Sequence, residues 1–309
     1  RKLNVSFRNV DGCLLVEVGR SLGGQRHLKT PHASGGFSAM TKVAVYTCAI
    51  GDHDWIHRPQ VKPPGVDFIR FSNARPWRPM GWHYQDLPPI PGADTPRVLS
   101  RFPKLRPMDA LPNYEIAIWI DASVEIIGDI TPLIQGFRET DTDIALFPHP
   151  SGRTVAEEFT FAIEAGRIGP EFYQAADRQK QRYAEMGLSD RKIIEASIIF
   201  YRLPSEALRE AGQAWWHEIT HFTERDQVSQ PYAMQGSDLS IHLWDWHFKQ
   251  DNPYFRRLPH RPKTWIKRLR TGAQYLGDSR WDYRLARHFV RGAATVKRAG
   301  LSMLSRRSG

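Results

Sequence analysis

The sequence predicts an α/β fold in which a mostly parallel central sheet is flanked by helices. Strand-like segments alternate with helical segments along the chain, and this order favours a parallel sheet. Several of the strand-like segments are unbroken apolar runs, which are typical of strands covered on both faces. The length of 309 residues is sufficient to bury one large core or two small ones.

Five segments have the apolar and β-branched pattern of strands. They are 42–50, 66–71, 114–123, 143–147 and 193–201. The run 116–120 contains no polar residue, which places this strand at the centre of the sheet rather than at its edge. Residues 75–97 are rich in Pro and Trp and are predicted to form an irregular loop.

Helical segments follow most of these strands. They are 100–111, which two prolines shorten or break, 129–137, 154–165, 171–186, 205–222 and 225–234. Thr131 and Pro132 fit an N-cap and a first helical position. Thr154 with Glu157 fits a capping box, and Gly187 fits the end of a helix.

The two ends of the chain differ from its middle. Residues 1–39 are rich in Gly, Ser and Pro, so we expect a poorly ordered extension there, with Met40 as the natural start. A hairpin over 5–18 is the alternative. Residues 40–254 are predicted to form the folded domain, and residues 255–309 a basic C-terminal arm.

Composition narrows the class of protein. No apolar stretch approaches the roughly 20 residues that cross a bilayer, and residues 1–30 lack the pattern of a signal peptide. With only Cys13 and Cys48 we expect no disulfide framework and a cytoplasmic location.

The positive charge is concentrated in the C-terminal arm. Residues 255–309 hold 15 Lys and Arg against two Asp, a balance of +13, whereas residues 1–254 hold 28 Lys and Arg against 31 acidic residues. Because the folded body is nearly neutral, we expect no specific nucleic acid partner for it.

Asp121 is the strongest candidate for a functional residue. It ends the apolar run 116–120, and a carboxylate at the end of a buried strand is costly unless a cation, a metal or hydrogen-bond donors meet it. Ligands of open α/β sheets lie just outside the carboxyl ends of the strands. The alternative is an Asp that caps a helix or closes a turn.

Other polar residues follow neighbouring strands and could assemble a nucleotide site with Asp121. They are Tyr46, Thr47, Gly51, Asp52, Ser72, Asn73 and Ser123. Arg101 and Lys104 are candidates to bind phosphates, with a solvated basic helix face as the alternative. A Mg²⁺ or Mn²⁺ ion takes one or two carboxylates plus phosphate oxygens. The chain has neither a Walker A lysine loop nor a GxGxxG motif, so kinase and dehydrogenase functions lose their main support.

Two further clusters follow in the chain. His149 is a candidate metal ligand, Arg153 a candidate for an anionic group, and Glu158 a candidate acid or base.

In the other cluster, Arg225, Asp226 and Gln227 stand at a helix junction. Either Asp226 caps the following helix, or it is the catalytic base that takes a proton from an acceptor hydroxyl. Trp215 falls on the apolar face of its helix, which predicts core packing.

Eight motifs in order carry a family resemblance: YTCAIGDHD, VDFIRFSN, SRFPKLRP, IWIDASVEI, FPHPSGRTVAEE, QRYAEMGL, AWWHEI and ERDQVS. Over residues 42–243 the chain resembles the glycosyltransferase-like domain family of plant mucilage and turgor-regulation proteins and their bacterial relatives. The resemblance implies a single α/β/α domain of the GT-A type that transfers a sugar from a nucleotide-diphospho-sugar donor to a glycan or lipid-linked acceptor.

The resemblance also implies residue roles. The acidic motif that binds metal and sugar nucleotide falls on Asp121, and residues 46–51 would hold the base and ribose. Arg225, Asp226 and Gln227 would lie on the acceptor side. From the residues themselves, we expect His149, Arg153 and Glu158 on the same acceptor or donor-sugar side as Arg225 and Gln227, with Asp226 as the candidate base.

The usual Asp-x-Asp is Asp121-Ala122-Ser123 here. Either another group, such as His149 or a residue near Asp226, completes the shell of a divalent metal (Mn²⁺ or Mg²⁺), or the metal dependence is weak.

The basic arm lies outside the resemblance. Its pattern suits an amphipathic helix on anionic lipid, where each Lys or Arg contributes about 1 kcal/mol. The alternative is a solvated helix that packs on the domain. The sequence therefore predicts a glycosyltransferase, docked on the inner face of the membrane by its arm. Two other classes stay open: a non-catalytic GT-A-like scaffold that binds glycan or nucleotide, and a nucleic acid binder acting through the arm.

Overall fold

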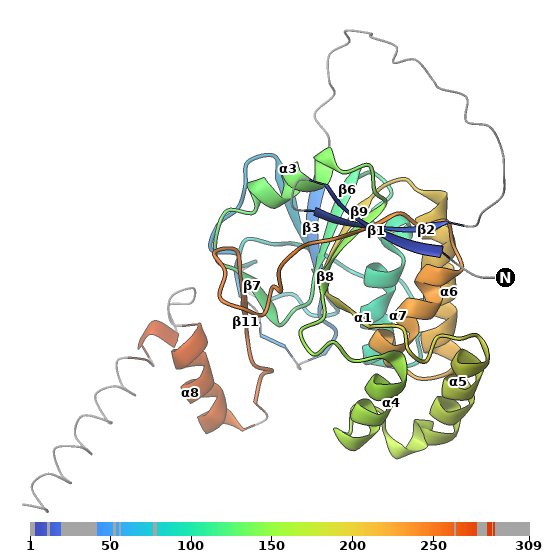
Figure 1. Cartoon of the computed structure of the whole chain (residues 1–309). Coiled ribbons are helices and arrows are strands. Elements are labelled where there is room, and N and C mark those ends of the chain that lie inside the picture. Colours follow the sequence, from blue (N-terminus) through green and yellow to red (C-terminus); the bar gives the residue numbers. More distant parts are fainter. Residues whose placement is uncertain are drawn as a thin grey trace, which may run out of the picture.

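The computed structural model describes residues 4–10, 13–19, 42–51, 54–55, 57–76, 79–262, 264–276, 283–285 and 287. Within these residues, nine strands form one sheet in the order β1-β2-β10-β8-β9-β6-β3-β4-β5, and β7 pairs with β11 in a separate ribbon (Figure 1). The strands are β1 (Asn4–Val10), β2 (Cys13–Gly19), β3 (Val43–Cys48), β4 (Val66–Phe71), β5 (His83–Gln85), β6 (Ile116–Ile120), β7 (Val124–Ile126), β8 (Ile144–Pro148), β9 (Ile194–Arg202), β10 (Ile241–Leu243) and β11 (Phe255–Arg257).

The helices connect and cover these strands. They are α1 (Pro96–Leu105), α2 (Pro107–Ala110), α3 (Thr131–Glu139), α4 (Val155–Glu164), the 3₁₀ turn η1 (Pro170–Phe172), α5 (Tyr173–Glu185), α6 (Glu206–His221), α7 (Asp226–Gln235) and α8 (Trp265–Tyr275). No helix in the described part of the chain is long and apolar enough to cross a membrane.

The seven strands from β10 to β5 form the mostly parallel central sheet that the sequence predicts. β3 is parallel to both β4 and β6, and β10 is parallel to β8. β9 is the exception, because it lies antiparallel between β6 and β8. All five residues of β6 are buried, which confirms the prediction of a central strand covered on both faces.

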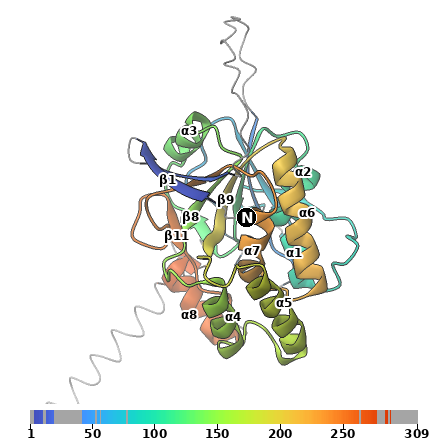
Figure 2. The ribbon, with the colours of Figure 1, turned by 45° about the vertical axis from the view of Figure 1, so that its right-hand side comes forward.

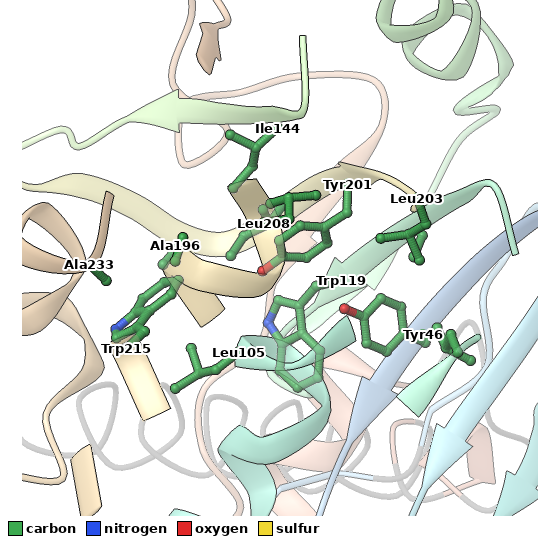
Figure 3. Packing of buried hydrophobic residues seen from close by; sticks show 14 of the residues in the cluster. Tyr46, Leu105, Trp119, Ile144, Ala196, Tyr201, Leu203, Leu208, Trp215 and Ala233 are labelled. Carbon is green, nitrogen blue, oxygen red and sulfur yellow. The ribbon is translucent and has the colours of Figure 1, made fainter. Parts of the chain in front are cut away.

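Two hydrophobic cores cover the two faces of the sheet. On one face, α1, α6 and α7 pack against β3, β6 and β9; Figure 3 shows Tyr46, Trp119 and Leu105 within this core. On the other face, α3 and the β7–β11 ribbon pack against the same strands. Figures 1 and 2 show α3 opposite α1, α6 and α7, with the sheet between them.

Most helix signals in the sequence mark real boundaries. The capping box of Thr154 and Glu157 is present at α4, and Gly187 has a φ of +71° just after α5. Two boundaries were wrong. α1 begins at Pro96 rather than at Ser100, with Thr95 as its N-cap. Ile130, not Thr131, precedes α3, and the carboxylate of Asp129 accepts a hydrogen bond from the Thr131 amide at 2.9 Å. The predicted loop 75–97 also contains the short strand β5.

Strands are found beyond both predicted limits of the folded domain. β1 and β2 form the alternative hairpin, and β2 pairs with β10, so residues 4–10 and 13–19 extend the sheet. Residues 20–41, with Met40, lie outside the described part. At the other end, β11 begins the basic arm and pairs with β7. The domain limits at 39 and 254 stay predictions.

Candidate functional site

An ion network lies at the carboxyl end of β6, where α1 and α7 meet the sheet. The Lys104 ammonium of α1 is 2.6 Å from the Asp226 carboxylate of α7 and 3.6 Å from the carboxylate of Asp121. Arg101, one turn earlier on α1, places its Nε 3.5 Å from Asp226. The structure therefore brings together four residues that the sequence singled out separately.

Asp121 is held on one side and open on the other. Its Oδ1 accepts a hydrogen bond from the Trp119 indole at 2.8 Å, and the Lys104 ammonium faces the same oxygen. Its Oδ2 accepts no hydrogen bond from the described residues, and the side chain is 25% exposed. Asp121 can therefore accept a hydrogen bond from a ligand without losing its own supports.

Lys104 and Asp226 are buried, unlike Asp121. The Lys104 side chain is only 2% exposed, so it is not the solvated helix face that was the alternative reading. Burial raises the pKa of Asp226, but Arg101, Lys104 and Arg225 outweigh it and hold this pKa well below its usual range. A carboxylate this acidic is a weak base, so the geometry favours a role for Asp226 in holding Lys104 over the predicted role of proton acceptor.

Hydrogen bonds from the side chains of Trp215 and Tyr201 hold the backbone that carries this network. Trp215 is buried in the core, as its helical spacing predicts, and its indole donates to the Asp226 carbonyl at 3.0 Å. The Tyr201 hydroxyl of β9 donates to the Lys104 carbonyl at 2.7 Å. Both helices that carry the charges are thereby tied to buried side chains.

The predicted base and ribose residues divide into buried and exposed groups. Tyr46 is completely buried and packs edge-on against Trp119, so it lies in the core rather than at the sheet edge. Thr47 is also buried, and in the described part of the chain its hydroxyl has no hydrogen-bond partner.

The residues at the surface of this edge belong to loops. The amide of Gly51, whose φ is +80°, donates to the Asn73 side chain at 3.1 Å, which joins the ends of β3 and β4. Ser72, in contrast, is buried, and its hydroxyl donates to the Ala74 carbonyl at 2.9 Å. Asp52 lies outside the described residues.

The residues around Asp121 do not fit a metal site made of protein ligands alone. In the described part of the chain, no three His, Cys, Asp or Glu side chains converge on a common point. Lys104 stands 3.6 Å from Asp121, and its charge opposes a divalent cation there. Ser123 provides no second carboxylate. Its backbone carbonyl accepts a hydrogen bond from the Leu258 amide at 2.7 Å.

His149 does not join Asp121 either. Its Nε2 is 3.8 Å from the buried carboxylate of Glu195, which also binds Lys249 and the Ser197 hydroxyl. Burial is the main reason that the pKa of His149 is lowered to about 4. His149 is therefore a neutral imidazole within a separate polar cluster.

A second ion network adjoins the first. The fully buried Glu158 of α4 binds Arg153 at 2.7 Å and Arg225 at 2.9 Å. Arg225 immediately precedes Asp226, so the two networks are continuous along the chain. Gln227, beside them, donates its side-chain amide to the Ile194 carbonyl and so supports the start of β9.

Sequence reasoning missed Arg70 of β4. Its side chain is buried, and Nε and Nη1 have no hydrogen-bond partner among the residues that the structure describes. Arg70 pairs in register with Thr47 on one side and Tyr84 on the other. The signal was present, because an Arg between the apolar residues Ile69 and Phe71 of a strand is unusual.

No protein-family model and no curated protein matches this sequence, so the family resemblance of its motifs stays a prediction. Among solved structures, core-mannan synthase A from Aspergillus fumigatus in its Mn/GDP form has a TM-score of 0.37 and 12% identity, over 84% of this chain and 89% of that chain.

Two further structures are similar at the same level. The apo form of the bifunctional glycosyltransferase WbbM has a TM-score of 0.37 and 10% identity, over 64% of this chain and 38% of that chain. A197 from STIV has a TM-score of 0.33 and 8% identity, over 65% of this chain and 81% of that chain. These similarities are too low to carry an argument, so the α/β assignment rests on the sheet itself.

Proposed function

We propose that the protein is a glycosyltransferase that uses a nucleotide-diphospho-sugar donor. The observation that carries this proposal is Asp121, a half-open carboxylate beside a buried ammonium at the carboxyl end of a central strand. That edge is where open α/β sheets bind ligands. The family resemblance of the eight motifs points in the same direction.

Each charged residue then has a separate role. The free oxygen of Asp121 accepts a hydroxyl of the donor. Arg101 and Lys104 offset the charges of Asp121 and Asp226, so that the site can accept the charge that develops on the departing diphosphate. Asp226 holds Lys104 in place. Because the Lys104 ammonium contacts the carboxylates of both Asp121 and Asp226, these residues do not fit a metal ion, and we expect donor binding to persist without Mn²⁺.

The test is thermal unfolding of the full chain with UDP, GDP, CMP and ADP, each with and without Mn²⁺. A ligand at 100 times its dissociation constant stabilises a protein by about 2.7 kcal/mol. We expect one nucleotide to stabilise the wild type but not Asp121→Ala, and the sugar nucleotide with that base to release nucleoside diphosphate when an acceptor is present.

The matched control is Asp177→Ala, which removes an exposed carboxylate of α5. This variant should respond to the nucleotide like the wild type. If none of the nucleotides stabilises the folded wild type, the glycosyltransferase proposal fails. If a nucleotide binds but the corresponding sugar nucleotide is not turned over, the hypothesis of a non-catalytic binding scaffold is favoured.

We also propose that the C-terminal arm contacts an anionic membrane surface, which places the protein at the inner face of the membrane. In α8 the apolar face is covered for only part of its length. Leu276, just after the helix, packs against Trp55 and Leu258, whereas Trp265 and Leu269 are 70% and 41% exposed. The predicted packing on the domain is therefore found at one end of α8 alone.

The exposed end of α8 combines apolar and basic side chains. Trp265, Ile266 and Leu269 stand beside Lys267 and Arg270, the combination that lets a helix lie in the interface of an anionic bilayer. We expect the protein to sediment with vesicles of phosphatidylcholine and phosphatidylglycerol, and less with phosphatidylcholine alone.

The double variant Trp265→Ser, Leu269→Ser should lose this binding. Met186→Ser, at an exposed Met far along the chain from α8, is the control. Equal sedimentation of both variants would contradict the membrane contact. Self-association that disappears in the double variant would instead assign the face to a second copy.

A further inference from the structure

Arginines from four separate segments gather beside the ion network of Asp226. We call Arg97, Arg153, Arg167 and Arg225 the arginine cluster. Arg97 belongs to the first turn of α1, Arg153 and Arg167 flank α4, and Arg225 precedes α7. Such convergence from distant parts of the chain is not the charge pattern of a single solvated helix face.

Contacts join the members of the cluster in pairs. Arg153 and Arg225 share the buried carboxylate of Glu158, at 2.7 and 2.9 Å. The guanidinium groups of Arg153 and Arg167 both lie over the ring of Phe161, at 3.9 and 4.8 Å from its centre. These guanidinium groups are thus oriented by contacts within the protein itself.

The cluster has more positive than negative charge. Arg97 donates to the Arg167 carbonyl at 3.2 Å, and its nearest carboxylate, Glu224, is 3.9 Å away. Arg167 has no ion pair among the residues that the structure describes. Burial and then repulsion from Arg101 lower the pKa of Arg97; burial and then repulsion from Arg225 lower that of Arg167. An anion at this place would relieve the repulsion.

We propose that the arginine cluster binds an oxyanion of the acceptor, so that the acceptor is an acidic sugar or a phosphorylated one. Guanidinium groups in a fixed arrangement suit the paired oxygens of phosphate and carboxylate. The cluster joins the network on the side of Arg225 and Asp226, away from the half-open carboxylate of Asp121. This assignment of the acceptor rests on the proposed glycosyltransferase function.

The experiment measures binding of inorganic phosphate and of glucuronate to the full chain by calorimetry. Each titration is done alone and with a saturating amount of the nucleotide that binds at Asp121. The variants are Arg97→Gln and Arg167→Gln, because neither residue holds Glu158 and their loss leaves no buried carboxylate without a partner. Arg178→Gln removes an exposed arginine of α5 and is the control.

We expect binding of phosphate, glucuronate or both in the presence of the nucleotide, weakened about tenfold by each variant and unchanged in the control. Tighter binding of phosphate would indicate a phosphorylated acceptor, and tighter binding of glucuronate would indicate an acidic sugar. Two results would overturn the inference. One is that neither phosphate nor glucuronate binds. The other is that the nucleotide fully displaces the oxyanion and that both variants lose nucleotide affinity, which would assign the cluster to the donor diphosphate.

Failure of the proposed function gives a different result. If no nucleotide binds but phosphate still binds and depends on Arg97 and Arg167, the anion site stands and its assignment to an acceptor falls.

Discussion

Replacing Lys104 by Met tests the ion network at the end of β6. The change keeps an unbranched side chain, one atom shorter, and removes its charge, which leaves the Asp226 carboxylate without its partner at 2.6 Å. Breaking one half of a buried ion pair costs about 3–5 kcal/mol. Since Arg101 remains 3.5 Å from Asp226, we expect the lower end, about 3 kcal/mol at pH 7.

The cost should depend on pH with a definite sign. In the wild type the pKa of Asp226 is lowered, so the pair contributes stability at neutral pH, above the pKa of the unfolded chain, and loses it as the pH falls through the folded pKa. In Lys104→Met this pKa rises, and protonation of Asp226 relieves the unpaired charge. The deficit of the variant should therefore shrink below about pH 4.

Urea unfolding of wild type, Lys104→Met, Asp226→Asn and the double variant between pH 3 and pH 8 measures these differences. We expect the double variant to be more stable than Lys104→Met, because neutral Asn needs no cation, with a coupling energy on the order of 1–3 kcal/mol. A loss under about 1 kcal/mol at pH 7, or additive effects of the two changes, would refute the reasoning.

Two other predictions concern buried groups. Burial lowers the pKa of His57 to about 4 in the folded protein. Below about pH 6.5 the unfolded chain therefore binds a proton at His57 that the folded chain does not bind. The free energy of unfolding should fall by up to about 3 kcal/mol as the pH is lowered toward 4. His57→Gln should flatten this part of the stability profile in urea unfolding, and a profile parallel to wild type would contradict it. Glu158→Gln weakens the hydrogen bonds of Arg153 and Arg225 and should cost about 2 kcal/mol in the same measurement, whereas Glu164→Gln, at an exposed site on the same helix, should cost nothing measurable.

The sequence was sufficient to predict the long strands but not the short ones. β4 has the predicted bounds, β3, β8 and β9 lie within two residues of theirs, and β6 lies within three, because each is a run of apolar residues with a clear end. Strands of three residues, such as β5, β7 and β11, are too short to show a period. β5 pairs with the longer strand β4, whereas β7 and β11 pair only with each other among the described strands.

The candidate site shows the same division. Asp121 could be predicted from the end of a buried run. The burial of Lys104 could not, because its partner Asp226 is 122 residues further along the chain. Tyr46 was predicted to contact a ligand, yet alternation along β3 turns its ring to the core between Phe71 and Trp119. The local sequence pattern predicts which residues belong to a strand, but the contacts of each side chain depend on tertiary packing.

The position of β9 has a consequence for synthesis of the chain. β9 is made after β6 and β8 but lies between them, antiparallel to both. Until residues 194–202 have left the ribosome, the two parts of the sheet cannot join, and β6 presents the apolar edge of IAIWI to other chains. Unpaired apolar edges of this kind promote aggregation. A nascent chain that stalls before residue 194 is therefore the form of this protein most in need of a chaperone.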